Sequence, residues 1–368
     1  AYHSAAPRRE ADAPRLIGDI LDELVRVFDG LHADLGTDAA NFDSCARTRL
    51  STAAPLLHAR GAAGHVRRCH GDLHLRNLVL LGGVPTPFDA LEFDETLGTC
   101  DVLYDLAFLL MDLRHRALPR AANIVLNSYL LAAVGAEDRG LAALPLFLAT
   151  RAAIRAMVTL QTNRARNLPA RADAEARRYL EDAMAALAPA GPRLVAVGGL
   201  SGTGKTTLAR ELAPHIGAAP GAVHLRSDLE RKAMAGIDPQ TRLPAAHYAK
   251  EGRDRVYQRM LERGKALLRA GHSVLLDATF LDRTNRDNAA ALASALGLPF
   301  TGFWLEAPTT TLLARIAARR GDASDADATV LQAQLTRDPG RLDWHRLASG
   351  DPLQTALDDA LTVLGAGA

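Results

Sequence analysis

Apolar and polar positions follow different rhythms in the two halves of the chain. In the first half apolar residues recur every three to four positions, the spacing that gathers side chains on one face of a helix. This pattern predicts helices over residues 14–36, 47–57, 103–116, 120–134, 141–163 and 171–188. In the second half short apolar runs alternate with helical stretches, as in a parallel sheet covered by helices. We therefore expect a mostly helical region followed by an α/β region.

Four apolar runs of the second half predict parallel strands, over residues 194–197, 222–228, 271–277 and 300–306. One helix is predicted to begin near Thr207, and three more are predicted over residues 245–270, 284–296 and 309–320. Three of the strands end in an acidic residue, namely Asp228, Asp277 and Glu306. Ligands of parallel α/β sheets bind at the carboxyl ends of the strands. The three acids are therefore expected at the ligand-binding edge of a three-layer α/β domain.

A break in the helical pattern separates the two halves. The segment Ala188-Pro-Ala-Gly-Pro192 cannot continue a helix, and it comes directly before the first predicted parallel strand. A chain of 368 residues is long enough for two hydrophobic cores. We predict one domain over residues 1–189 and a second over 190–368. In the first, a strand, a polar loop and a strand are expected over residues 65–81, with another short strand over 87–94.

The first strand of the second half runs into Gly199-x4-Gly204-Lys205-Thr206, the complete P-loop pattern. Its glycines allow a tight turn in which backbone N–H groups converge on phosphate oxygens. Lys205 would reach the β- and γ-phosphates, and the Thr206 hydroxyl would bind Mg²⁺. Glycine-rich turns also occur without ligands, but strand, loop, Lys-Thr and helix in this order favour ATP. The candidate ATP-binding residues are Gly199, Ser201, Gly202, Thr203, Gly204, Lys205, Thr206 and Thr207.

Two carboxylates next to the P-loop are candidates for chemistry. Asp228 lies in Ser227-Asp-Leu-Glu-Arg231, where it could accept the proton of an attacking hydroxyl while Arg231 orients an anionic substrate. Its alternative is a cap of the following helix. Asp277 ends a strand in the manner of a Walker B acid and could hold a Mg²⁺-bound water. A cap or turn carboxylate is its alternative.

Arginines near residue 315 predict a lid over the phosphates. Arg315, Arg319 and Arg320 fall mostly on one face of a helix, and a polar, mobile-looking segment, residues 321–326, follows. Cationic residues on a closing lid would stabilise the charge of a transferred phosphoryl group. A solvated helix face is the alternative. Arg283 and Arg286 are weaker candidates.

The order P-loop, Ser-Asp-x-x-Arg, Asp-Ala-Thr-Phe and Arg-x3-Arg resembles the small P-loop kinases related to phage polynucleotide kinase, zeta toxins and chloramphenicol kinases. The resemblance covers residues 193–345. It implies a kinase, with Asp228 as general base and Arg231 as a substrate-orienting group. It also implies that Arg315 or Arg319 is the lid arginine.

The first domain contains a second motif, Cys69-His-Gly-Asp-Leu-His-Leu-Arg-Asn77. With Asp89 twelve residues later and an Asp101-x3-Asp105-Leu-Ala segment, it resembles the C-lobe of aminoglycoside phosphotransferases. The resemblance implies that Asp72 is a catalytic base and that Asn77 and Asp89 bind Mg²⁺.

The N-lobe of that family has no counterpart here, because residues 1–65 contain no lysine and no phosphate-covering loop. Since the sequence begins at Ala1, we interpret it as a fragment rather than as a degenerate kinase. The tandem arrangement resembles a bacterial family of bifunctional kinases.

Composition narrows these hypotheses only slightly. A net charge of +1 and 5% aromatic residues argue against a nucleic-acid-binding protein with a basic or stacking surface. Three cysteines without metal-ligand spacing, no signal peptide and no membrane-spanning apolar run predict a cytoplasmic protein without a membrane partner. The leading hypothesis is an ATP- and Mg²⁺-dependent kinase acting on a hydroxyl acceptor: a nucleic-acid 5′ end, a nucleotide sugar or an antibiotic-like molecule. The alternative is a regulatory ATP-binding module with little turnover. The oligomeric state is not predicted.

Overall fold

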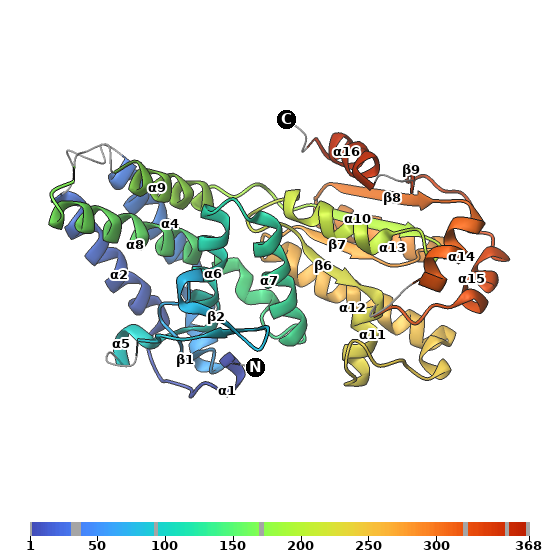
Figure 1. Ribbon diagram of the computed structural model, residues 1–368, viewed down its shortest axis with the longest axis horizontal. Coiled ribbons are helices and arrows are strands. Elements are labelled where there is room, and N and C mark those ends of the chain that lie inside the picture. The colour runs from blue at the N-terminus through green and yellow to red at the C-terminus, as the bar shows by residue number, and fades with distance from the viewer. Residues whose placement is uncertain are drawn as a thin grey trace. The chain divides into compact units, whose positions relative to one another are not determined.

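The computed structural model describes residues 2–30, 38–91, 95–168, 173–318, 323–349 and 353–365 (Figure 1). The chain divides into two compact units. The first comprises residues 1–125 and 140–189, and the second comprises residues 126–139 and 190–368. The first unit is mostly helical and the second is α/β, which confirms the predicted fold class.

Helices form most of the first unit. They are α1 (Tyr2–Ala5), α2 (Ala13–Asp29), α4 (Asp38–Ala62), α5 (Glu95–Gly98), α6 (Val102–His115), α8 (Leu144–Ala165) and α9 (Ala174–Leu187), with the 3-10 turn η1 (Leu75–Asn77). The 3-10 turn η2 (Asp138–Ala143) begins in the second unit and ends in the first. Helix α7 (Pro119–Ala132) begins in the first unit and ends in the second. The apolar stripe of α2 is buried from Ile17 to Phe28, and the Asp12 side chain caps its first turn by accepting from the Arg15 N–H at 3.2 Å.

The η2–α8 segment, residues 138–165, is long and apolar enough to cross a membrane, with a mean hydropathy of 1.6 over its most apolar window. By length and composition it contradicts the prediction that the chain has no membrane-spanning apolar run. In the structure 72% of that window is buried inside the protein, as expected for a core helix. Fully buried Leu144, Phe147 and Ala153 line the packed side of α8.

Two short antiparallel pairs complete the first unit. β1 (Val66–Arg68) pairs with β4 (Thr99–Asp101), and β2 (Leu78–Leu81) pairs with β3 (Val84–Pro87). The predicted strand over 87–94 is wrong, because the strand lies earlier and ends at Pro87. Gly82 and Gly83 both have positive φ, which lets a two-residue turn fold β3 directly back onto β2. Residues 92–94 lie outside the described part of the chain.

The second unit is built on a parallel five-stranded sheet. Its strands are β5 (Leu194–Gly199), β6 (Val223–Arg226), β7 (Val274–Asp277), β8 (Phe300–Glu306) and β9 (His345–Ala348), in the spatial order β6-β7-β5-β8-β9. The P-loop strand β5 is central, between β7 and β8. Strand β9 was not predicted, since only one of its four side chains, Leu347, is buried and its sequence lacks a run of apolar residues.

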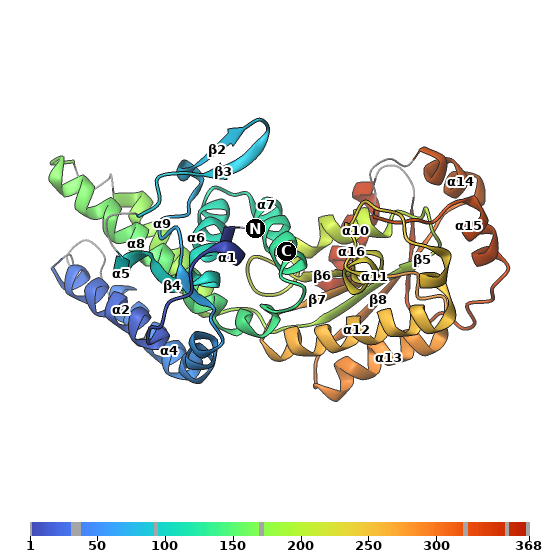
Figure 2. The same cartoon turned by 90° about the horizontal axis from the view of Figure 1, so that it is seen from below.

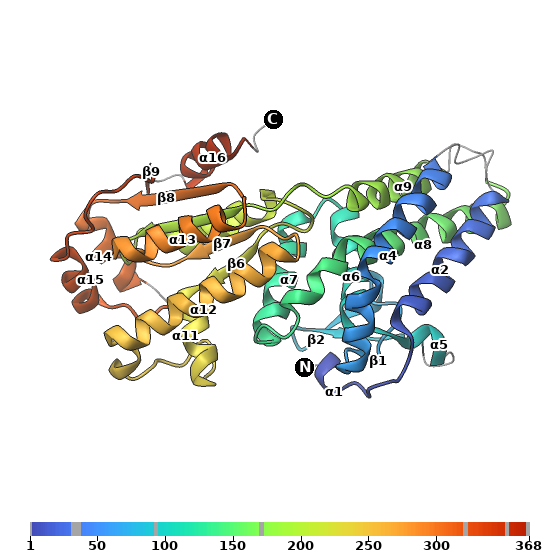
Figure 3. The same cartoon turned by 180° about the vertical axis from the view of Figure 1, so that it is seen from behind.

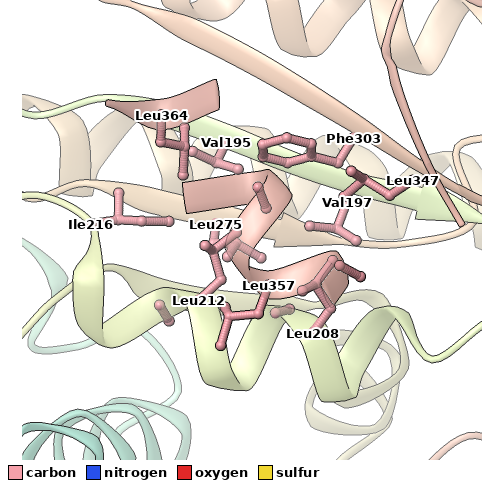
Figure 4. Close-up of a cluster of buried hydrophobic side chains, with 14 of the residues drawn as sticks. Val195, Val197, Leu208, Leu212, Ile216, Leu275, Phe303, Leu347, Leu357 and Leu364 are labelled. Carbon is pink, nitrogen blue, oxygen red and sulfur yellow. The ribbon is translucent and has the colours of Figure 1, made fainter. Parts of the chain in front are cut away.

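Helices cover both faces of this sheet. The helices are α10 (Lys205–Leu212), α11 (Ser227–Ala235), α12 (Lys250–Arg269), α13 (Arg283–Ala295), α14 (Thr309–Ala318), α15 (Ala328–Leu335) and α16 (Leu353–Leu364), with 3-10 turns η4 (Ala213–His215) and η5 (Ala245–Tyr248). Helices α10 and α16 lie on one face, and α12 and α13 lie on the other (Figures 2 and 3). The core under α10 and α16 contains Val195, Val197, Leu208, Leu275, Phe303, Leu347 and Leu357 (Figure 4).

Residues 126–139 belong to the second unit through specific contacts. The Asn127 side chain accepts from the His224 N–H at 2.7 Å and donates to the Ala222 carbonyl at 3.3 Å. Strand β6 is an edge strand, so these bonds occupy backbone groups that would otherwise be open to another strand. The Asn127 side chain thus protects this edge of the sheet.

A buried ionic network continues from the same segment. Arg263 of α12 donates to both carboxylate oxygens of Asp138, at 2.7 and 2.8 Å, and also to Glu230 of α11. Glu230 further accepts from Arg259 at 2.8 Å. Asp138 and Glu230 are only 3% and 2% exposed, so the guanidinium compensates charge that water cannot solvate. The network fixes α11 against α12.

We expect Arg263→Met to lower the free energy of unfolding by about 3–5 kcal/mol, because the substitution leaves Asp138 buried without its cation. Chemical denaturation of the whole chain measures this change. The matched control is Arg269→Met on the same helix, where the arginine is exposed. Equal stabilities of the two variants would show that the network contributes nothing to folding.

Candidate active site

The P-loop turns in a way that only glycine permits. Gly199, Gly202 and Gly204 have φ values of +135°, +89° and +84° between β5 and α10. A Cβ atom on Gly199 would lie 2.5 Å from the Leu305 carbonyl oxygen, and one on Gly202 would lie 2.9 Å from that of Leu312. Both torsion and space therefore require glycine at these two positions.

The loop leads directly into the N-terminus of α10, which begins at Lys205. An uncompensated helix N-terminus attracts anions, and the residue before the helix, Gly204, has no side chain that could cap it. The Lys205 ammonium donates to the Leu200 carbonyl at 2.8 Å, which holds it against the inner side of the loop. The Thr203 hydroxyl donates to the same carbonyl at 2.8 Å. The loop is thus shaped as a nest for an anion.

The Thr206 hydroxyl and the Asp277 carboxylate lie side by side at the carboxyl ends of the strands. The Thr206 hydroxyl donates to the Asp277 carboxylate at 2.6 Å, because β5 and β7 pair with Val197 opposite Asp277. Burial alone would raise the pKa of Asp277, but the hydrogen bond with His224, whose Nε2 lies 3.2 Å away, and nearby cations lower it to about 2. Burial also lowers the pKa of His224, which favours its neutral form. Ionised carboxylate and hydroxyl oxygens are ligands that fit Mg²⁺.

Asp228 lies in the first turn of α11, and Arg231 follows one turn later, with its guanidinium donating to Asp228 at 3.3 Å. Burial raises the pKa of Asp228, and the charge of Arg231 opposes this rise. The Arg231 guanidinium also lies over the Tyr248 ring, 4.7 Å from its centroid, and its Nε has no hydrogen-bond partner in the described part of the chain. The N-cap position of α11 is occupied by Arg226, so Asp228 lies inside the helix and is not its capping residue.

One cavity of about 830 Å³ joins these groups. The predicted residues that line it are Ser201, Gly202, Gly204, Lys205, Thr206, Thr207, Asp228, Arg231, Asp277 and Arg315. Gly199 and Thr203 lie behind this surface and shape the loop. Arg315 of α14 donates to the Ser349 hydroxyl at 2.8 Å. Arg319 and Arg320 lie outside the described residues.

Other charged residues from the sequence analysis serve the fold. Glu306, at the end of β8, accepts from Arg346 at 3.0 Å and does not line the cavity. Arg286 is buried and donates to the carbonyls of Phe280 and Leu281, so it clamps a loop. Arg283 is exposed and pairs with Asp287 within its own helix.

Two residues of the cavity wall, Asp325 and Gln334, were not predicted from the sequence. Asp325 accepts from Lys232, Tyr248 and the Leu243 N–H, and these bonds fix a stretch that its composition had suggested to be mobile. Gln334 of α15 contacts the P-loop itself. The sequence holds no signal for either, because their partners lie 77 to 133 residues away.

The loop of the first unit brings its three predicted residues into one region. The Asn77 amide donates to the Asp72 carboxylate at 3.0 Å. Asp105 accepts from the Gly71 N–H at 2.9 Å and from the His70 N–H at 3.2 Å, so it braces the turn before Asp72. Asp89 is exposed. Its segment is held to this loop by two backbone hydrogen bonds, from the Phe88 N–H to the Asn77 carbonyl and from the Leu91 N–H to the His70 carbonyl.

The fold and the site together define the second unit as a P-loop nucleotide-binding domain. In agreement, residues 194–338 match the family described as "AAA domain". An uncharacterized protein of Mycobacterium tuberculosis is 34% identical over 299 residues, which is 79% of this chain and 58% of that protein. The chain therefore spans little more than half the length of this relative.

Solved structures similar to the chain include an unliganded sugar kinase from Janibacter sp. HTCC2649, 26% identical, with a TM-score of 0.36. It matches 47% of this chain and 95% of its own. A gluconokinase from Sinorhizobium meliloti 1021 is 23% identical, with a TM-score of 0.35, and matches 48% of this chain and 93% of its own.

We expect Lys205→Ala to weaken ATP binding about ten- to a hundredfold, since charge-assisted hydrogen bonds contribute roughly 1.5–3 kcal/mol. Titration calorimetry measures the affinity. Lys265→Ala, an exposed lysine of α12, is the control and should leave the affinity unchanged. An unaltered ATP affinity in Lys205→Ala would remove the P-loop from the nucleotide site.

Proposed function

We propose that the second unit is an ATP- and Mg²⁺-dependent phosphotransferase that transfers the γ-phosphoryl group to a hydroxyl acceptor. The observation that carries this proposal is the shared cavity of Asp228, Lys205 and Thr206. A nucleotide-binding loop alone would serve a switch or a motor equally well. Transfer to a hydroxyl also requires a group that accepts the hydroxyl proton. Asp228, a carboxylate with a raised pKa beside the phosphate nest, can serve as that group.

In this reaction Asp228 accepts the hydroxyl proton as the acceptor oxygen attacks the γ-phosphorus. The bond between the γ-phosphorus and the β–γ bridging oxygen breaks, and ADP leaves with the bonding electrons. Lys205 and the amides of the loop stabilise the charge that develops on the phosphates. Thr206 and Asp277 would hold Mg²⁺, which would neutralise part of the charge on the phosphates.

Two kinds of arginine complete the proposed machinery. Arg231 would orient the acceptor, because it lies one helical turn after Asp228 and lines the same cavity. Arg315 or Arg319 would meet the transferred phosphoryl group from the lid. Of these, Arg315 lines the cavity, where its partner Ser349 donates in turn to the Thr203 carbonyl of the P-loop.

The acceptor class stays open among nucleic-acid 5′ ends, nucleotide sugars and antibiotic-like small molecules. A screen with labelled ATP over 5′-OH oligonucleotides, sugars and aminoglycosides tests all three. The competing function is a regulatory module in which nucleotide state controls a partner. A kinase releases ADP only when its acceptor is present, whereas a regulatory module binds ATP and shows little turnover with any acceptor.

We expect Asp228→Asn to lower the rate of transfer about a hundred- to ten-thousandfold while ATP affinity and melting temperature stay near wild type. Asparagine caps a helix about as well as aspartate, so a structural role would survive this substitution. Asp254→Asn, at an exposed position of α12, serves as the control. A folded, active Asp228→Asn protein would eliminate the general-base assignment.

The first unit offers a second, weaker candidate site. The Asn77 amide donates to the Asp72 carboxylate, and Asp105 braces the turn before Asp72. The pKa of Asp72 is lowered, because hydrogen bonds from His74 and Asn77 outweigh its burial. We propose that this loop does not phosphorylate a substrate in the present chain, since residues 1–65 supply neither a lysine nor a phosphate-covering loop.

Asp72→Asn should therefore leave ATP consumption and acceptor transfer by this chain unchanged. Steady-state kinetics with the acceptor found in the screen measures both. The Asp228→Asn protein is the reference for a loss of activity. A marked loss in Asp72→Asn as well would indicate that the first unit takes part in transfer.

A further inference from the structure

Gln334, near the end of α15, contacts the P-loop through both the oxygen and the nitrogen of its carboxamide. Its Oε1 accepts from the Ser201 backbone N–H at 2.8 Å, and its Nε2 donates to the Ser201 hydroxyl at 3.0 Å. Gln334 is half-buried and Ser201 is only 7% exposed, and both line the cavity described above. A neutral side chain from a distant helix thus occupies a hydrogen-bond donor of the anion nest.

The contact lies at the terminal-phosphate end of the loop. In a P-loop the backbone N–H groups receive phosphate oxygens, and the lysine reaches the β- and γ-phosphates. Here the Lys205 ammonium lies 2.8 Å from the Leu200 carbonyl, next to Ser201 in the chain. Ser201 and Lys205 line the same cavity, so we place the Ser201 N–H beside the region that the last phosphates of a triphosphate would enter. The Gln334 oxygen stands where a phosphoryl oxygen would bind.

A carboxamide has the chemistry to change partners there. Its oxygen can give up the Ser201 N–H to a phosphate, and its NH₂ group can then donate to the same phosphate. Hydrogen bonds to a charged acceptor are stronger than the neutral one that is lost. A diphosphate, which lacks the third phosphoryl group, would have to break the contact without this compensation or leave it in place.

We propose that Gln334 determines specificity for the γ-phosphate: it yields the Ser201 N–H to ATP and donates to the terminal phosphoryl group. The proposal rests on the ATP site proposed above and adds a means by which α15 distinguishes ATP from ADP. Gln332 provides a matched control, because it lies on the same helix, is exposed and does not line the cavity.

The test compares the affinities of the wild-type chain, Gln334→Ala, Gln334→Glu and Gln332→Ala for ADP and for a non-hydrolysable ATP analogue, both with Mg²⁺, by titration calorimetry. We expect the wild type to prefer the analogue, and Gln334→Ala to lower this preference about tenfold, the loss of one charge-assisted hydrogen bond. Gln334→Glu should weaken analogue binding further, because its carboxylate would face the phosphates. Gln332→Ala should match the wild type.

Each result decides the proposal. A preference for the analogue that survives in both Gln334 variants, or a wild type that binds both nucleotides equally, would overturn the role of Gln334 and leave the ATP site intact. A wild type that binds neither nucleotide would overturn the ATP site together with it. Gln334→Glu keeps the size of the side chain, so a folded variant is available if Gln334→Ala is unstable, as melting temperatures will show.

Discussion

The hydrogen bond between Thr206 and Asp277 is the contact on which the candidate site depends. It joins the first turn of α10 to the end of β7, and it requires the parallel register in which Val197 lies opposite Asp277. That register is fixed by a core in which Val195, Val197 and Leu275 are fully buried. A shift by one residue would turn these side chains to the opposite face of the sheet. Hydrophobic packing therefore sets the position of the proposed Mg²⁺ ligands.

The opposite wall of the cavity depends on polar contacts. Asp325 joins Lys232 of α11 to Tyr248, and Gln334 joins α15 to the P-loop. The Lys232–Asp325 ion pair is buried and holds its part of the wall in place. The neutral hydrogen bonds of Gln334 exchange partners more readily, because they are nearly balanced by bonds to water or ligand. The cavity thus combines a rigid side that holds the phosphates with a side suited to respond to the bound nucleotide.

Helix α11 lies between these two sides and carries Asp228 and Arg231. Its Glu230 is held by Arg259 and Arg263 of α12, and Arg263 is held in turn by Asp138. A general base acts only within hydrogen-bond reach of its proton, so the helix that carries the proposed base Asp228 must be firmly placed. The buried carboxylates, costly by themselves, are explained by this positioning of α11.

The sequence by itself determined the α/β fold of the second unit, the first four strands of its sheet in chain order and the P-loop. These features depend on local patterns, namely the period of the apolar residues, the glycines of the tight turn and the Gly-x4-Gly-Lys-Thr spacing. Such patterns involve residues close together in the chain, so the sequence shows them directly. Only the tertiary structure decided the fifth strand β9, the contact of Gln334 with Ser201 and the cap of Asn127 on β6. Their partners lie 42 to 133 residues apart in the chain, and neither a strand with one buried side chain nor a single polar side chain carries a pattern that indicates a distant partner.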